Sequence, residues 1–237
     1  MDKIKTTHVG SLPRSKKLSE ILFKKDKNEL FDQGELDKII EEDVNKIVKK
    51  QIDIGIDIIS DGEMSKISYA TYVKDRLHGF SGESERRAPK DLDDFPSYKE
   101  KIAKSGGTPT YTRPCCTADL KIKDTKSLTK DISNLKSALK KNNHSQGFIN
   151  SASPGVISNF LPNKFYKNDD KYLEALSKIM KTEYDEITKN DLLLQIDCPD
   201  LALARHMTFK NVSDEEFLVR AEKQIECLNE AIKDIDA

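Results

Sequence analysis

Short apolar runs alternate with long amphipathic segments along this chain, and that alternation limits its possible folds more than any other feature. Four segments place apolar residues at the three-and-four spacing of one helical face, so we expect helices at 36–52, 128–139, 172–187 and 213–232. Short strands are expected near Lys5 to Val9, Ile56 to Ser60, Asp119 to Ile122, Phe148 to Ala152 and Leu192 to Ile196. Such alternation is typical of a parallel sheet covered by helices.

The predicted fold class is α/β, of the (β/α)8 TIM-barrel type, with only about the first five strand–helix units present. A closed barrel needs eight strands and about 250 residues, whereas this chain has 237 residues. A long insertion is also expected at about 78–114. We therefore expect residues 1–237 to form a single partial barrel domain that stops where a sixth strand is due. An open doubly wound sheet, complete as it stands, is the alternative.

The composition excludes several classes of protein. The net charge is −1 with 34% charged residues spread along the chain, so no basic field is available for nucleic acid or an anionic membrane surface. No apolar run approaches the roughly 18 residues of a membrane-spanning helix, and the first ten residues lack the pattern of a secretion signal. Four cysteines do not make a disulfide framework in a chain of this length. We expect a cytoplasmic protein.

Polar residues follow three of the expected strands. Gly10 and Ser11 end the first, and their backbone N–H groups and the serine hydroxyl could hold a carboxylate. Glu63 follows the second in an Asp-Gly-Glu sequence, where it could bind an ammonium group. Asp197 ends the run of largely apolar residues that begins at Leu192, and burying an unpartnered acid is costly. Taken alone, the first two segments are more typical of ordinary turns, whereas Asp197 could equally belong to a structural ion pair.

The cysteines and histidines do not form a convincing metal site. Structural zinc sites favour cysteines separated by two to four residues, whereas Cys115 and Cys116 are adjacent, and we expect a buried thiol pair there. Cys227 falls on the apolar face of the last expected helix. Arg113, just before the cysteine pair, could meet an anionic substrate or form a surface ion pair. We expect no metal ligands within this chain.

Several motifs, taken in order, resemble the catalytic barrel of the cobalamin-independent methionine synthase family, and most closely its shorter single-barrel relatives. They are the opening Thr-x-x-Val-Gly-Ser-Leu-Pro-Arg from Thr6 to Arg14, the Asp-Gly-Glu at 61–63, the Ser-Pro-Gly at 153–155, and the Gln-Ile-Asp-x-Pro at 195–199. The stretch from Tyr172 to Tyr184 also matches. The resemblance covers essentially the whole chain and implies a barrel fold and a methyltransferase activity.

The resemblance also implies an amino-acid pocket. By this reading, the backbone and hydroxyl of Val9, Gly10 and Ser11 would hold the homocysteine carboxylate. Glu63 and Asp197 would bind its ammonium group.

A folate-type methyl donor is implied less closely. Arg113 matches an arginine of the family's folate-binding stretch, and Phe160 stands where the family has an aromatic residue against the pterin ring. The family's folate-contacting glutamate, six residues after the aspartate of the Gln-Ile-Asp motif, is Leu203 here, and Cys198 replaces an acidic residue. These departures put folate binding of the usual kind in doubt.

The family's zinc ligands and catalytic histidine lie in the last third of the barrel, and we expect them beyond Ala237. Zinc would deprotonate the homocysteine thiol, because the thiolate is the nucleophile. The leading hypothesis is a zinc-dependent methyltransferase that converts homocysteine to methionine, with this chain alone inactive. The alternatives are a thiol alkyltransferase with another acceptor or donor, and a vestigial, non-catalytic amino-acid-binding protein.

Overall fold

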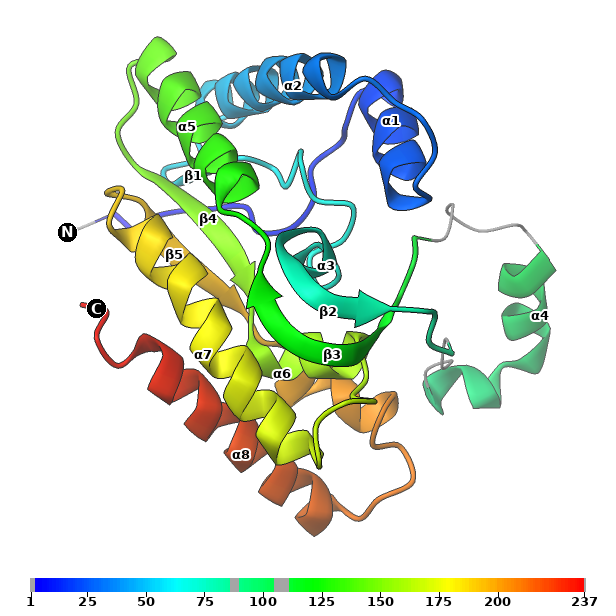
Figure 1. Ribbon diagram of the computed structural model, residues 1–237. Helices are drawn as coiled ribbons and strands as arrows, with labels where there is room; N and C mark the ends of the chain where they lie inside the picture. Colours follow the sequence, from blue (N-terminus) through cyan, green and yellow to red (C-terminus); the bar gives the residue numbers. More distant parts are fainter. Residues whose placement is uncertain (1–2, 86–89, 105–110, 237) are drawn as a thin grey trace.

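The computed structural model describes residues 3–85, 90–104 and 111–236, and combines a parallel sheet with covering helices (Figure 1). Parts of the expected insertion, 86–89 and 105–110, therefore lie outside the described residues. In chain order the elements are α1 (Lys16–Asp26), α2 (Gln33–Asp53), β1 (Ile59–Ser60), α3 (Val73–Arg76), β2 (Leu77–Ser81), η1 (Lys90–Asp94), α4 (Pro96–Lys104), β3 (Cys115–Ile122), α5 (Lys126–Lys141), β4 (Gly147–Ala152), α6 (Pro154–Phe160), α7 (Asp169–Thr188), β5 (Leu193–Asp197), η2 (Pro199–Leu201), η3 (Leu203–His206) and α8 (Asp214–Ile232).

The main sheet consists of β1, β4 and β5, paired in parallel and in chain order. Its register places Ile59 opposite Gly147, and Ala152 opposite Asp197. Successive strands lie side by side without a reversal of order, as in the sheet of a (β/α) barrel. The prediction of a parallel sheet with covering helices is confirmed, whereas the expected number of about five parallel strands is not, since three are found among the described residues.

The expected strand at 119–122 exists but belongs elsewhere, so its assignment to the parallel sheet was wrong. It forms part of β3, which pairs antiparallel with β2 in a separate two-stranded sheet. A strand inside a parallel sheet is covered on both faces, whereas five of the eight residues of β3 are exposed. The charged residues Asp119 and Lys121 are among these exposed positions. Its partner strand, β2, lies at the start of the expected insertion at about 78–114, where no strand was predicted.

The expected strand at 5–9 is reduced to one parallel bridge between Thr7 and Ile58. Two backbone N–H groups, those of Asp57 and Ile58, donate to the Thr6 carbonyl, and side-chain hydrogen bonds add to them. The backbone N–H and the hydroxyl of Thr6 each donate to Asp57 Oδ2 at a distance of 2.8 Å, and Lys3 forms an ion pair with Asp57 at 2.7 Å. These contacts keep the N-terminal segment beside β1 without a ladder of backbone hydrogen bonds.

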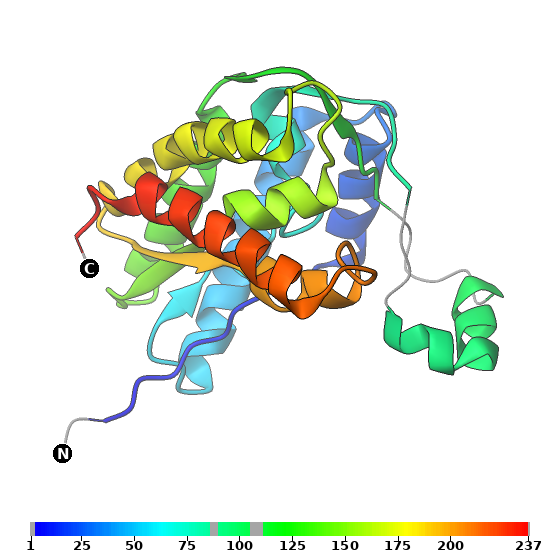
Figure 2. The same cartoon turned by 90° about the horizontal axis from the view of Figure 1, so that it is seen from below.

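The four expected helices are confirmed as α2, α5, α7 and α8, each with an apolar stripe buried against the sheet or a neighbouring helix. The capping box of α8 is also present, because Ser213 and Glu216 each accept from the other's backbone N–H. Helix α1 was not expected from the sequence. It is capped by Ser15 and buries Leu18, Ile21 and Leu22 against α2. Figure 2 shows α8 running beside α7 along the sheet.

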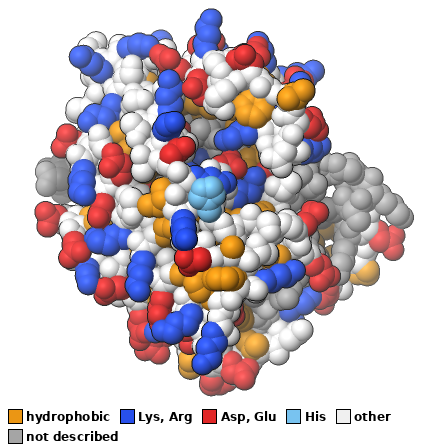
Figure 3. Space-filling model, viewed as in Figure 1, with side chains coloured by type: hydrophobic (Ala, Val, Ile, Leu, Met, Phe, Trp, Pro, Cys, Tyr) orange, Lys and Arg blue, Asp and Glu red, His pale blue; other side chains and the backbone are white. Residues whose placement is uncertain are grey.

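Acidic and basic side chains are interspersed on the face shown in Figure 3. Within the described residues, no helix is long and apolar enough to cross a membrane. Both η1 and α4 lie to one side of the main body (Figures 1 and 2).

A buried ion-pair network connects the β2–β3 unit to the helices that cover the sheet. Arg76, at the end of α3, contacts Glu183 of α7 and Asp131 of α5, each at 2.6 Å. Burial acts to lower the pKa of Arg76, but these two carboxylates outweigh it and raise that pKa. Glu183 also accepts from Ser151 of β4 at 2.6 Å and from the Tyr72 hydroxyl. One arginine thus joins α3, α5, α7 and, through Glu183, β4.

We predict that Arg76→Met lowers the free energy of unfolding by about 3–5 kcal/mol, because it leaves two buried carboxylates without their cation. The control is Lys49→Met on α2, which breaks the exposed pair of Lys49 with Asp53. That change should cost less than about 1 kcal/mol. Urea unfolding of both variants measures the difference. Equal effects from the two substitutions would contradict a structural role for the Arg76 network.

Candidate functional site

A cluster of polar side chains lies at the carboxyl ends of the three parallel strands. Glu63 follows β1, Asn150 lies within β4, and Asp197 is the last residue of β5. Ligands of parallel α/β folds meet this edge of the sheet. Ser11 reaches the same place from the N-terminal segment, because Leu12 N–H donates to the Gly62 carbonyl at 3.0 Å.

Four of these side chains are joined by hydrogen bonds. Ser11 Oγ donates to Glu63 Oε2 at 2.5 Å. Asn150 Nδ2 donates to Glu63 Oε1 at 2.6 Å and to Asp197 Oδ2 at 2.9 Å. The structure therefore brings together Ser11, Glu63 and Asp197, which are far apart in the sequence, and places the amide of Asn150 between the two carboxylates.

The cluster carries more buried negative charge than its nearest cations offset directly. Burial, and then the charge of Glu63, raise the pKa of Asp197, although the hydrogen bond from Asn150 opposes this. Burial also raises the pKa of Asp61. The neighbouring cations bond to backbone carbonyls: Lys66 Nζ to that of Asn150, and Arg14 Nη2 to those of Glu63 at 2.7 Å and Lys66 at 2.6 Å. In these contacts the carboxylates of Glu63 and Asp197 both accept hydrogen bonds from the Asn150 amide, and neither forms a direct ion pair with Lys66 or Arg14.

Backbone strain positions Glu63. Gly62 and Glu63 both have positive φ, at 66° and 57°. Glycine tolerates this conformation, whereas for a glutamate it is unfavourable. A Cβ atom at Gly62 would lie 2.9 Å from Met64 Cε and 3.1 Å from Leu12 Cβ. The chain therefore needs glycine at 62, and it holds Glu63 in a costly conformation that directs its carboxylate to Ser11 and Asn150.

Val9 and Gly10 lead into this cluster. The Val9 side chain is exposed, and Gly10 has a φ of 99° with open space where a Cβ would stand. Val9 has an apolar side chain and Gly10 has none, so any contribution of these two residues to binding comes from their backbone.

Arg113 and Phe160 also lie against each other. The guanidinium of Arg113 stands 4.5 Å from the centre of the Phe160 ring, and Tyr69 meets that ring edge-on at 5.6 Å. Burial, then the neighbouring Tyr111 and the charge of Asp197, raise the pKa of Tyr69 to about 12. Tyr69 is thus a phenol at neutral pH.

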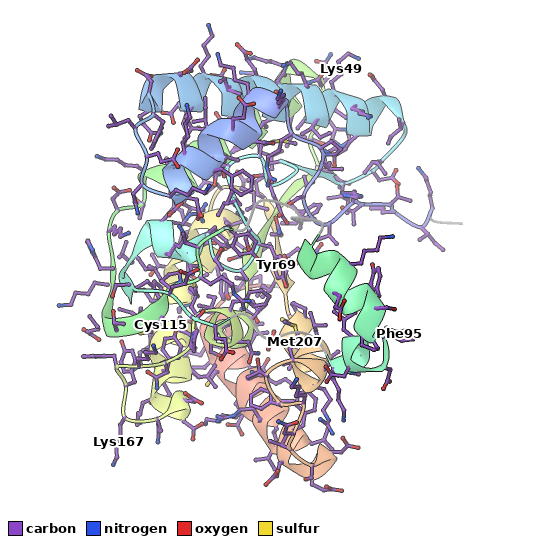
Figure 4. The ribbon with its side chains drawn as sticks, turned by 90° about the vertical axis from the view of Figure 1, so that its right-hand side faces the viewer. Lys49, Tyr69, Phe95, Cys115, Lys167 and Met207 are labelled. Carbon is purple, nitrogen blue, oxygen red and sulfur yellow. The ribbon has the colours of Figure 1, made fainter. Side chains whose placement is uncertain are left out.

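A cavity of about 570 Å³ is lined by Arg113 and Phe160. Its walls also include Asp200, Leu203 and Met207. Ser11, Glu63 and Asp197 do not line it, so the cavity is distinct from the carboxylate cluster. Figure 4 views this side of the molecule, with Tyr69, Cys115 and Met207 labelled.

The described residues contain no group of three or more His, Cys, Asp or Glu side chains arranged to hold a metal ion. Cys115 and Cys116 are both buried, as expected, and so is Cys227 on α8. Cys115 lines the cavity. The donor set that zinc prefers is therefore not assembled within the part of the chain that the structure describes.

Two residues of the site, Asn150 and Lys66, were not expected. Asn150 interrupts the apolar run Phe148-Ile149, and a polar residue inside a fully buried strand is a signal that sequence reasoning could have used. Lys66 is 1% exposed and bonds to the Asn150 carbonyl, but nothing distinguishes it in sequence from the many surface lysines of this chain.

Comparison with known proteins identifies the family. The model of the family described as "Cobalamin-independent synthase, Catalytic domain" matches residues 4–233. This chain belongs to that family. Curated relatives match over a shorter segment: proteins of Lactococcus lactis and Bifidobacterium animalis, both named 5-methyltetrahydropteroyltriglutamate–homocysteine methyltransferase, are 29% and 32% identical over 75 residues. That segment is 32% of this chain and 10% of each relative.

Solved structures support the fold. A putative vitamin-B12-independent methionine synthase of Listeria monocytogenes covers 100% of this chain, with a TM-score of 0.67 and 19% identity. A B12-independent methionine synthase of Shewanella sp. W3-18-1, in complex with selenomethionine, covers 87% with a TM-score of 0.63 and 19% identity. This chain spans 64% and 52% of those two chains.

We predict that Asp197→Asn raises the thermal unfolding temperature at pH 7. The raised pKa of Asp197 means that the folded state binds the carboxyl proton more tightly than the unfolded state does. Ionisation of Asp197 therefore destabilises the fold as pH rises above the ordinary pKa of an aspartate. The gain should therefore disappear as pH falls to about 4. The asparagine can still accept the hydrogen bond from Asn150.

Asp57→Asn is the opposite control. Hydrogen bonds from Lys3 and Thr6 lower the pKa of Asp57 to about 2, so its ionised form stabilises the fold. This variant should melt at a lower temperature than the wild type at pH 7, and the deficit should shrink as pH falls toward 2. Melting curves of both variants between pH 2.5 and 7 test the signs. An Asp197→Asn protein less stable than wild type at pH 7 would show that this carboxylate is a stabilising partner.

Proposed function

We propose that this chain binds homocysteine and serves a methyltransferase reaction in which a methyl group passes from a folate-type donor to the homocysteine thiol. The observation that carries the proposal is the pair of carboxylates, Glu63 and Asp197, held on either side of the Asn150 amide. In the reaction an S–CH3 bond forms, the donor's bond to its methyl group breaks, and the thiol proton replaces the methyl group on the donor.

The cluster suits the ammonium group of an amino acid. An ammonium ion offers three N–H donors, and the two carboxylates have acceptor positions left after the bonds from Ser11 and Asn150. A ligand cation would also add to the charges of Lys66 and Arg14, which donate to backbone carbonyls rather than to these two carboxylates. Charge-assisted hydrogen bonds of this kind are among the stronger polar contacts in proteins.

The carboxylate of the amino acid would lie near Ser11. The Ser11 hydroxyl donates to Glu63 in the free protein, so a substrate carboxylate takes that donor only when Glu63 turns to the substrate ammonium. The backbone N–H groups of Gly10 and Ser11 offer further donors. Gly10, with open space around its Cα, lets a ligand approach the backbone closely.

The names of the relatives support the same acceptor. The curated relatives are named as homocysteine methyltransferases, and the Shewanella structure contains selenomethionine, which carries the ammonium and carboxylate that we assign to this cluster. The described residues do not assemble a zinc site. Activation of the homocysteine thiol is therefore not assigned to any of the described residues.

The donor side has two candidates. Arg113, Phe160 and Tyr69 form a cationic and aromatic surface beside the cavity, which suits a planar folate-type donor with an anionic tail. Leu203 lines that cavity in place of the glutamate implied by the family resemblance. This apolar wall favours the second candidate, a thiol alkyltransferase with a different methyl or alkyl donor.

Calorimetric titration with L-methionine tests the acceptor site. We expect Glu63→Gln and Asp197→Asn each to weaken binding about 10- to 100-fold, the effect of losing a hydrogen bond to a charged group. The control Glu226→Gln removes a carboxylate that is 60% exposed on α8 and should leave affinity unchanged. Norleucine should bind, whereas 4-(methylthio)butyrate, which lacks the ammonium group, should not.

Binding should also weaken as pH falls through the raised pKa of Asp197, because the ammonium group requires the ionised carboxylate. Loss of this pH dependence in Asp197→Asn would assign it to that residue. The proposal fails if the wild type ignores methionine at millimolar concentration, or if the two site variants bind it as tightly as the wild type.

A further inference from the structure

The cavity lined by Arg113 and Phe160 has buried polar groups of its own. Asp200, in η2, is 3% exposed and lines the cavity. Ser153 Oγ donates to Asp200 Oδ1 at 2.8 Å, which fixes the carboxylate at the start of α6. Burial raises the pKa of Asp200, and the bond from Ser153 only partly opposes this. A cavity-lining acid held in this way has acceptor positions left for a ligand.

Gln224 of α8 lies next to this acid. It is 2% exposed and lines the same cavity. A Cβ atom built at Gly155 would lie 2.0 Å from Asp200 Oδ2 and 3.1 Å from Gln224 Cδ, so the two side chains meet over that glycine. Gln224 Oε1 is buried without a hydrogen-bond partner among the described residues, and so is Asn159 Nδ2 on the wall formed by α6.

A buried polar atom without a partner destabilises the fold, so its presence on a cavity wall points to a ligand that supplies the partner. Asp200 Oδ2 and the Gln224 amide, whose Oε1 has no partner, both lie over Gly155, and the Asn159 amide donor also lines the cavity. The other walls supply the Phe160 ring with its stacked Arg113, together with Met207 and Phe209. The set is complementary to a flat ring that presents adjacent N–H donors at one edge.

We infer that Asp200 and Gln224 are the specificity-determining residues for the methyl donor, binding the N–H edge of a 2-amino-4-oxo-pyrimidine type ring within the cavity. The inference rests on the proposed function for its choice of donor. It assigns to these two residues the polar contact that an acid at Leu203 would otherwise make. Gly155 is part of the same device, because any side chain at that position would displace the Asp200 carboxylate.

Fluorescence titration with pterin, the bare 2-amino-4-oxo-pteridine, tests the inference, and the absence of tryptophan from the chain simplifies the signal. We expect wild-type protein to bind pterin more tightly than lumazine, in which a carbonyl replaces the 2-amino group. Asp200→Asn should weaken pterin binding about 10- to 100-fold, and Gln224→Met about 3- to 10-fold. The preference for pterin over lumazine should shrink in both variants.

The control variant is Glu222→Gln, which alters an exposed carboxylate on α8 two residues from Gln224 and should keep wild-type affinity. Gly155→Ala offers an independent route to the same loss, since it leaves Asp200 in the sequence but moves its carboxylate. Retained methionine binding in each variant shows that a lost pterin signal is not due to unfolding.

Two outcomes overturn the inference. One is a wild type that binds lumazine as well as pterin, or binds neither. The other is wild-type pterin affinity in both Asp200→Asn and Gln224→Met. Failure of the proposed function is separate, because it is read from methionine binding at Glu63 and Asp197. Binding of methionine without binding of pterin would support the amino-acid site and contradict this inference. Binding of pterin without binding of methionine would support this inference and contradict the proposed amino-acid site.

Discussion

The charge of Arg76 is the constraint on which the arrangement of this molecule depends. Its guanidinium is buried and cannot lose its proton, so the surrounding chain must supply acceptors. Asp131 does so from α5 and Glu183 from α7. The antiparallel β2–β3 unit begins directly after Arg76. The position of this unit over the parallel sheet is therefore fixed by an ion pair at its base as well as by apolar packing.

Strand β4 contributes residues to both the Arg76 network and the candidate site. Ser151 of β4 donates to Glu183 on the side of the covering helices, while its neighbour Asn150 donates to Glu63 and Asp197. Side chains of consecutive strand residues point to opposite faces, so one dipeptide connects the structural ion pairs to the carboxylate cluster. Lys66 adds a second connection, because it bonds to the Asn150 carbonyl and stands 4.6 Å from the centre of the Tyr72 ring.

The sequence predicted those parts of the fold that local periodicity determines. The stripes beginning at Leu36 and Leu128 became α2 and α5, because a helix needs one buried face and little else. The strand at 119–122 was misassigned, because a short alternating run does not reveal its partner: β3 pairs with β2 across a segment of more than thirty residues. The N-terminal strand was overextended, since the Asp57 side chain replaces most of its ladder.

For the site, the sequence predicted that Glu63 and Asp197 would lie close together, because both stand at the carboxyl ends of parallel strands. It could not predict Asn150 or Lys66, whose roles depend on contacts between residues more than 45 positions apart. Phe160 came from family resemblance alone, whereas Arg113 was also considered as a contact for an anionic substrate, and the structure places the two in contact. The polar wall of Asp200 and Gln224 had no signal in the sequence, because it forms only where η2, α6 and α8 pack together.

The left-handed backbone of Glu63 has a consequence for how this protein could change over time. A glutamate at a φ of 57° costs on the order of 1 kcal/mol or more relative to glycine, and mutation toward glycine or asparagine would relieve that strain. Selection for thermal robustness alone would thus tend to erase this carboxylate. Its persistence in a descendant would report a requirement other than folding, which makes position 63 an internal indicator of whether a lineage of such chains is still under selection for binding.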